Sequence, residues 1–216
     1  GGGGVGGAVI GGIATCWTVV GCVPGIIAGG SPGLSDDLIQ YINVASAGNA
    51  TNFGNLHTNV HMAAGMSNKV RGVFGGGYMH SPSLPAQNYM QYITIASTGN
   101  ASDFGDLTAA TKNMGAFSNS TRGVSGGGQS PSNTNVINFI TIATTGDATD
   151  FGDRTNSVEQ VTGASSPTRG VFAGGNPYTD VIDFVEILTT GNATDFGNLT
   201  DGRRGISGAS NGHGGL

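Results

Sequence analysis

The stretch GNATDFGNL at 191–199 decides the fold, because the chain carries three further copies of it that align without gaps. Those copies are GNATNFGNL (48–56), GNASDFGDL (99–107) and GDATDFGDR (146–154). Their starts at 48, 99, 146 and 191 are separated by 51, 47 and 45 residues. A period in this range indicates a chain assembled from repeated supersecondary units.

Each copy belongs to a larger unit that predicts four short strands. The alternating runs before the copies are YINVAS (41–46), YITIAS (92–97), FITIAT (139–144) and FVEILT (184–189). The glycine-rich strands are RGVFGGG (71–77), RGVSGGG (122–128), RGVFAGG (169–175) and the degenerate PGIIAGG (24–30). The small-residue runs are AAGMS (63–67), GAFS (115–118), TGASS (162–166) and SGAS (207–210). We therefore predict an all-β fold, a β-propeller of about four blades of four short antiparallel strands.

The two ends of the repeat region complement each other. The run at 207–210 supplies a first strand, and PGIIAGG (24–30) supplies a second strand. Pairing of these segments would close the ring and leave no open edge. We expect a glycine-rich, uncharged arm at 1–23 and a repeat domain at 24–216, with units at 25–56 plus 200–212, 57–107, 108–154 and 155–199. The alternatives are a ring completed by another subunit and a β-rich trimeric fibre.

Composition argues against several classes of protein. Gly accounts for 41 of 216 residues and charged residues for 10%, which disfavours long exposed helices. The net charge is −5 and the eight Lys and Arg are scattered, so we expect no nucleic-acid partner. The stretch Ala8–Gly30 is interrupted by Gly, Thr and Pro and has no basic flank, so we expect no membrane span. Cys16 and Cys22 could close a small disulfide loop or act as buried apolar side chains.

Residue types that carry chemistry are few, and we expect no catalytic residue, cofactor or metal. Asp147, Asp150 and Asp153 have a spacing that calcium ligands could use, but their counterparts in the first unit are all Asn. Side chains that cap turns explain both sets better. His57 and His61 are four residues apart, a spacing that does not converge on a metal from a strand, and no Glu accompanies them.

An arginine precedes the glycine-rich strand in three units, at Arg71, Arg122 and Arg169. A position that recurs in every unit usually serves the fold of the unit. We therefore expect these guanidinium groups to bond nearby carbonyls or turn carboxylates, such as those around Asp103 or Asp150. The alternative is a ring of cations that lines one face or the channel.

The loops after the glycine clusters differ most between units, and they carry the candidate binding residues. The longest is YMHSPSLPAQNY (78–89), and its counterparts are 129–135 and 176–180. In a propeller these loops share one face, where variable loops on a rigid scaffold serve binding. The candidate residues are Tyr78, His80, Gln87, Tyr89, Gln129, Asn133, Asn176 and Tyr178.

The order of motifs resembles the kelch family over about residues 24–216. The matching segments are GVFAGG (170–175), VIDFVEI (181–187), TDFGNL (194–199) and RRGISGAS (203–210). The fourth strand carries Phe where kelch repeats usually carry Trp, and Trp17 lies outside the repeats. The resemblance implies a propeller fold.

The combined motif also resembles a repeat of structural and fibre-like proteins of tailed bacteriophages, especially those of marine cyanobacteria. The residues that carry it are 71–77, 92–107, 122–128, 137–154 and 169–199. This resemblance implies a non-enzymatic, homo-oligomeric structural protein of the virion surface, extracellular in setting: a tail fibre, surface or decoration component. Its expected partners are other virion proteins and a host-surface glycan or protein. The alternatives are a kelch-like protein–protein interaction module and a carbohydrate-active propeller enzyme.

Overall fold

A computed structural model of the chain describes residues 8–11, 24–29, 37–79 and 86–210. These residues form strands and turns but no helix, and hence no helix that could cross a membrane. Four antiparallel sheets of four strands follow one another along the sequence, and each is built from consecutive strands except where a small hairpin interrupts the third. The predicted all-β class with four strands per unit is confirmed.

The strands have the following bounds. The first sheet contains β1 (Ala8–Gly11), β2 (Pro24–Ala28), β3 (Leu38–Asn43) and β4 (Thr51–Asn55). The second contains β5 (Ala64–Ser67), β6 (Arg71–Gly75), β7 (Tyr89–Thr94) and β8 (Ser102–Asp106). The third contains β9 (Gly115–Ser118), β10 (Arg122–Gly126), β13 (Val136–Thr141) and β14 (Thr149–Asp153), with the hairpin β11 (Gln129–Ser130) and β12 (Ser132–Asn133). The fourth contains β15 (Thr162–Ser165), β16 (Arg169–Ala173), β17 (Thr179–Glu186) and β18 (Thr194–Arg203).

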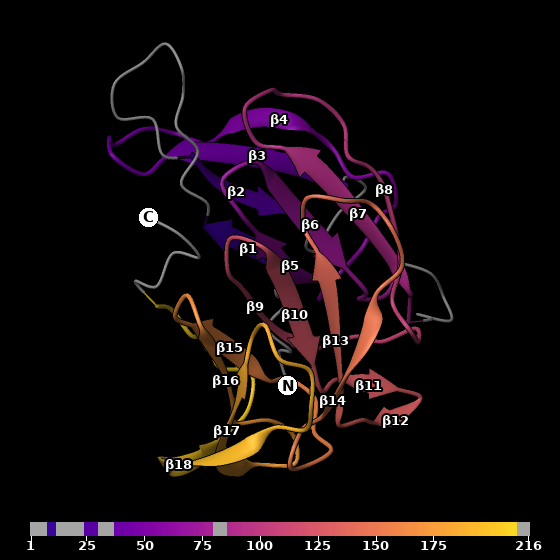
Figure 1. The fold of residues 1–216 in the computed structure, drawn as a ribbon. Helices are drawn as coiled ribbons and strands as arrows, with labels where there is room; N and C mark the ends of the chain where they lie inside the picture. Colours follow the sequence, from indigo (N-terminus) through magenta and orange to yellow (C-terminus); the bar gives the residue numbers. More distant parts are fainter. Residues whose placement is uncertain (1–7, 12–23, 30–36, 80–85, 211–216) are drawn as a thin grey trace.

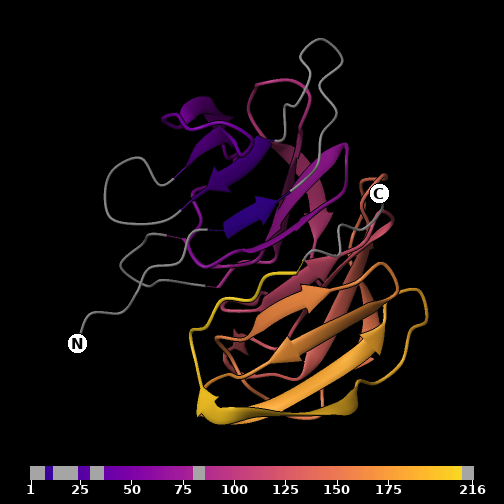
Figure 2. The ribbon, with the colours of Figure 1, turned by 90° about the vertical axis from the view of Figure 1, so that its left-hand side faces the viewer.

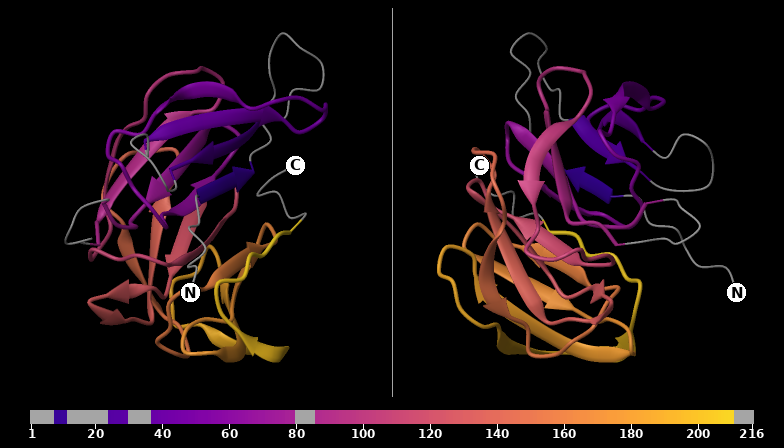
Figure 3. Two further views of the ribbon diagram at one scale, coloured as in Figure 1. Left: turned by 180° about the vertical axis from the view of Figure 1, so that it is seen from behind. Right: turned by 90° about the vertical axis from the view of Figure 1, so that its right-hand side faces the viewer.

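The four sheets stack face to face in an arc, in the order of the sequence (Figure 1). Their first strands β1, β5, β9 and β15 pack beside one another on the inner side. Their fourth strands lie toward the outer rim, and β18 forms one edge of the molecule (Figure 2). Seen from behind, the first and fourth sheets stand at the two ends of the arc (Figure 3). The arrangement is propeller-like.

Two sequence expectations need correction. We expected 207–210 to pair with the strand at 24–28, but β2 pairs with β1 on one side, from Ala8↔Ala28 to Gly11↔Gly25, and with β3 on the other. Both edges of β2 are thus occupied, and the expected arm at 1–23 contributes a strand of its own. The alternating strands also begin earlier than predicted: β7 ends at Thr94, because a turn closed by the Ser97 N–H to the Thr94 carbonyl follows it.

A bulge in every sheet sets the direction of the repeated Phe. In the second sheet Met90 faces Gly105 and Gln91 faces Asp103, so Phe104 has no partner in the register. The same shift occurs opposite Phe53, Phe151 and Phe196. A bulge bends its strand and re-aims a side chain. Phe104 thereby becomes one of the buried residues shared by the second and third sheets.

The turn between the third and fourth strands of one sheet binds the fourth strand of the preceding sheet. Gly99 donates its N–H to the Phe53 carbonyl at 2.8 Å, and Ala101 donates to Asn55 at 2.8 Å. In return, the Asn55 N–H donates to Oδ1 of Asn100 at 3.0 Å. The same three bonds recur between the second and third sheets and between the third and fourth. We call this set of contacts the inter-sheet joint.

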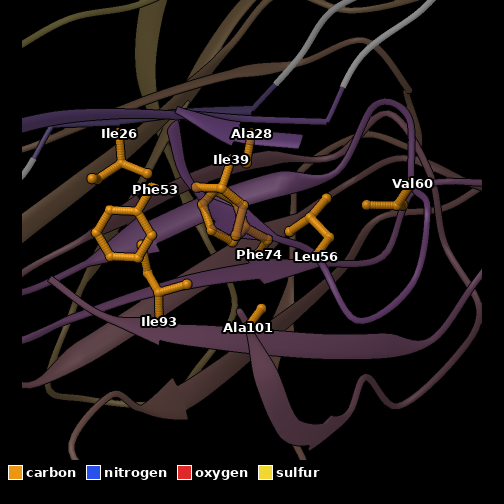
Figure 4. Packing of buried hydrophobic residues seen from close by; sticks show 9 residues of the cluster. All are labelled: Ile26, Ala28, Ile39, Phe53, Leu56, Val60, Phe74, Ile93 and Ala101. Carbon is orange, nitrogen blue, oxygen red and sulfur yellow. The ribbon is translucent and has the colours of Figure 1, made fainter. Parts of the chain in front are cut away.

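Side chains fill each joint from both sheets. Phe53 and Leu56 of the first sheet pack with Phe74 and Ile93 of the second (Figure 4). At the second joint Phe104, Leu107 and Ile140 occupy equivalent positions, and Ser125 replaces Phe74. At the third joint Phe151, Phe172 and Val185 do so, and Arg154 replaces Leu56. Close approach also limits side chains: a Cβ on Gly105, whose φ is +138°, would lie 2.4 Å from the Gly146 carbonyl oxygen. Only glycine fits at such a position.

Two of the recurring arginines bond backbone carbonyls, one of the two kinds of partner predicted, and not the turn carboxylates near Asp103 or Asp150. Arg71 lies 4.5 Å from the ring centre of Tyr92, whose ring meets Phe104 edge-on at 6.0 Å. Arg71 also donates to the Ile142 carbonyl of the next sheet, and Arg122 donates likewise to Ile187. Arg71 and Arg122 therefore each link an aromatic pair of their own sheet to the neighbouring sheet, which the sequence could not reveal.

A buried polar residue on the third strand secures the loop that leaves the preceding sheet. Gln91 accepts the N–H of His57 at 2.6 Å, and Asn138 accepts the Thr108 hydroxyl. At the third joint this position is Asp183, which pairs with Arg154 at 3.2 Å, and neither side chain is exposed. Burial lowers the pKa of Arg154 from its ordinary value, and the charge of Asp183 opposes that shift.

The first two joints predict how the third would behave without its ion pair. They place Leu56 with Gln91 and Leu107 with Asn138 at the positions of Arg154 and Asp183. We expect Asp183→Asn alone to lower the free energy of unfolding by about 3–5 kcal/mol, because it leaves a buried guanidinium without its counter-ion. The double variant Arg154→Leu/Asp183→Asn should have a free energy of unfolding within about 1 kcal/mol of that of the parent. Urea unfolding of both variants measures this. A double variant as unstable as Asp183→Asn would contradict it.

Candidate functional site

The loops after the glycine clusters meet the segments that enter the next strands, and together they form what we call the loop face. Three antiparallel bridges repeat there: His61 with Tyr78, Lys112 with Gln129, and Glu159 with Asn176. The backbone is thus the same in three units. The side chains differ in each: an imidazole faces a phenol, an ammonium group faces an amide, and a carboxylate faces an amide.

The first part of the loop face is an aromatic and basic cluster. The His61 and Tyr78 rings stack at 5.2 Å with a 14° angle between their planes. The Lys112 ammonium of the next unit lies 5.5 Å from the Tyr78 ring centre, a cation–π contact. Gln87 is tied to the same loop by its N–H, which donates to the Gly77 carbonyl. Both rings are thereby fixed in orientation.

The second part is a network centred on Glu159, which is only 7% exposed. One carboxylate oxygen accepts Nδ2 of Asn113 at 2.7 Å, and the other accepts Nδ2 of Asn176 at 2.9 Å. Asn133 donates to the Asn176 carbonyl at 2.6 Å. Charged acceptors make strong hydrogen bonds when buried. The network therefore holds three loops at fixed positions.

The third part is an exposed cation and ring at the edge of that network. Arg204 donates to Oδ1 of Asn176 at 2.9 Å and lies 4.7 Å from the Tyr178 ring centre. Tyr178 is 66% exposed, although Arg204 covers part of its ring. A planar ring beside a guanidinium and fixed amides offers both stacking and hydrogen bonding to a polar ligand.

The predicted site residues divide into three groups. The structure brings Asn133, Asn176 and Tyr178 together through Arg204 and Glu159. It brings Tyr78 and Gln129 together through Lys112, and Gln87 bonds the Gly77 carbonyl beside Tyr78. Tyr89 is 50% exposed and begins β7, and it takes part in none of the loop-face contacts described above. His80 lies outside the described residues.

Sequence reasoning missed the residues that organise the loop face, namely Lys112, Asn113, Glu159 and Arg204. Their signal was present in the alignment of the units. The position that carries His61 carries Lys112, Glu159 and Arg204 in the following copies. It therefore holds a different polar residue in each unit. Non-repeating polar residues at one repeated position are a signature of a variable surface on a constant scaffold.

The described residues differ from a metal site in how their ligand-type side chains are arranged. They contain no cluster of three or more His, Cys, Asp or Glu that could hold a metal ion. Of the aspartates whose spacing calcium ligands could use, Asp147 accepts the Asp106 N–H of the preceding sheet at 3.0 Å, so it serves the inter-sheet joint. Glu159 has both carboxylate oxygens engaged by amides, which suits a positioning role.

Comparison with known proteins bears on the fold alone. No protein-family model and no curated protein matches the sequence. Among solved structures, that of YjhT matches with a TM-score of 0.70 at 10% sequence identity. The match covers 92% of this chain and 67% of that chain. This likeness supports the propeller-like all-β architecture.

The two glutamates of the chain provide a test of the network. Glu159→Ala leaves the partly buried amides of Asn113 and Asn176 without their charged acceptor, so we expect a loss of about 2–3 kcal/mol of unfolding free energy. The control is Glu186→Ala, which removes an ion pair with Arg169 that is about half exposed and is worth at most about 1 kcal/mol. Thermal and urea unfolding compare the two. Equal losses would mean that the Glu159 network adds no stability.

Proposed function

We propose that this protein is a kelch-like propeller module that serves as a non-enzymatic structural protein of a virion surface, and that its loop face attaches to a host-surface glycan or protein. The observation that supports binding is the loop face itself. Residues that differ from unit to unit converge there on an otherwise repetitive scaffold. The virion setting rests on the resemblance of the repeat to phage fibre-like proteins.

The loop face favours a polar ligand such as a glycan. Tyr178 offers a flat apolar ring, and Arg204 with Asn176 offers fixed polar groups beside it. Sugars present both apolar ring faces and hydroxyl groups, so this combination matches their surface. The Glu159 network orders these groups before any ligand arrives, which reduces the entropic cost of binding.

Binding to an array of bacterial cell-surface oligosaccharides, and adsorption to host cells, test this proposal. We expect Tyr178→Ala and Arg204→Ala to weaken binding about tenfold or more, as for residues at the centre of an interface. Lys69→Ala is the matched control, because Lys69 is an exposed cation in the turn between β5 and β6, away from the loop face.

Three outcomes would overturn the proposal. Absence of glycan and cell binding, together with capture of one defined cellular protein, would favour the interaction module. Cleavage of a bound oligosaccharide would favour the carbohydrate-active enzyme. Binding that is unaffected by both loop-face variants would move the site elsewhere on the molecule.

A further inference from the structure

The fourth sheet exposes one half of the inter-sheet joint. Phe196 is 55% exposed, whereas its counterparts Phe53, Phe104 and Phe151 are 5%, 2% and 2% exposed. It projects from β18, the rim strand at one end of the arc (Figure 2). Arg169 also differs from the other repeated arginines: it binds Glu186 of its own sheet at 2.8 Å in place of a carbonyl in a following sheet.

The first sheet exposes the other half. Val44 is 64% exposed, whereas its counterparts Ile95, Ile142 and Ile187 are 5%, 0% and 0% exposed. Ile27 stands at the position of the buried Phe74 and is exposed in the same way. Ala50 in the turn is exposed as well, although the equivalent Ala101 is buried in the first joint.

The backbone groups at the two ends are complementary too. At the three internal joints, a Cβ on Gly54, Gly105 or Gly152 would meet the carbonyl oxygen of the next turn's glycine at 2.1, 2.4 and 2.4 Å. Gly197 occupies the same position with a φ of +140°, and apart from its chain neighbours no described residue would lie within 4 Å of a Cβ placed on it. On the first sheet, no described residue accepts a backbone hydrogen bond from the N–H of Gly48 or Ala50.

We infer that these two halves join copies of this chain head to tail: the first sheet of one copy packs on the fourth sheet of another. The turn at 48–50 of the first copy then binds β18 of the second. The three internal joints show that such halves fit, and both halves are present on every copy. In the joined state Ile27 and Val44 would cover Phe196, and Arg169 would gain the Val44 carbonyl as acceptor. A heterologous contact of this kind closes into a ring or extends into a filament, depending on its rotation.

The inner part of the fourth sheet is already covered by its own chain. Gly205 donates its N–H to the Gln160 carbonyl, and Ser165 donates to the Ser210 hydroxyl at 3.3 Å. These contacts resemble those that one unit makes with the next, such as Ser67 with Ser118. Among the described residues, the segment 207–210 forms no β-ladder with a strand. The β1 strand of the incoming copy can therefore displace it from the fourth sheet. The outer part, around Phe196, is the part left bare.

Two charge substitutions at exposed sites test the inference. Val44→Asp alters the half of the joint on the first sheet, and Phe196→Asp alters the half on the fourth sheet. Both side chains are more than half exposed in the single chain. In sedimentation velocity over a concentration series, the parent should assemble, and each variant alone should be monomeric, with a dissociation constant raised at least about a hundredfold. Mixing the two variants should form 1:1 dimers and nothing larger, because each supplies one intact half.

Leu188→Asp is the control, since Leu188 is 58% exposed but its counterparts Ala96 and Ala143 are exposed even at internal joints. It should assemble like the parent. A parent that stays monomeric at high concentration, or a mixture of the two variants that stays monomeric, would overturn the inference. Neither result depends on the proposed attachment function, which is read from glycan and cell binding.

Discussion

The turn of one sheet bound to the fourth strand of the preceding sheet is the contact on which the rest of the structure depends. Its three hydrogen bonds occur three times in nearly the same geometry. The bulge that frees the Phe from the register and the glycine that admits the neighbouring carbonyl both serve it. In the described part of the chain, the main contacts between sheets join neighbours, so the stability of the arc is approximately a sum of such joints.

The demands of the inter-sheet joint explain where the residues that vary between units lie. The strands must repeat, since every sheet carries both halves of a joint, and the second and third sheets use both. The loops beyond the glycine clusters take no part in the joint, and they are free to differ. The aromatic and amide groups of the loop face therefore stand on a scaffold whose geometry does not depend on them, although the buried Glu159 ties three of the loops together.

The period and the strand motifs predicted the four sheets well, because each motif is local and recurs. The contacts between sheets were beyond prediction, because they join residues such as Asn55 and Asn100 that are 45 positions apart. The strand β1 was missed, since residues 8–11 lack the motif of the other first strands. The predicted loops did converge, but Glu159, Lys112 and Arg204 were overlooked because each occurs once and resembles no known motif.

Hydrogen exchange of four backbone amides tests the central role of the joint most directly. The N–H groups of Gly99, Gly146 and Gly191 each bond the preceding sheet, whereas Gly48 is the equivalent residue at the free end. At a concentration where the chain is monomeric, the first three should be protected nearly as well as the core strands, and Gly48 should exchange orders of magnitude faster. Similar exchange at all four amides would contradict the account.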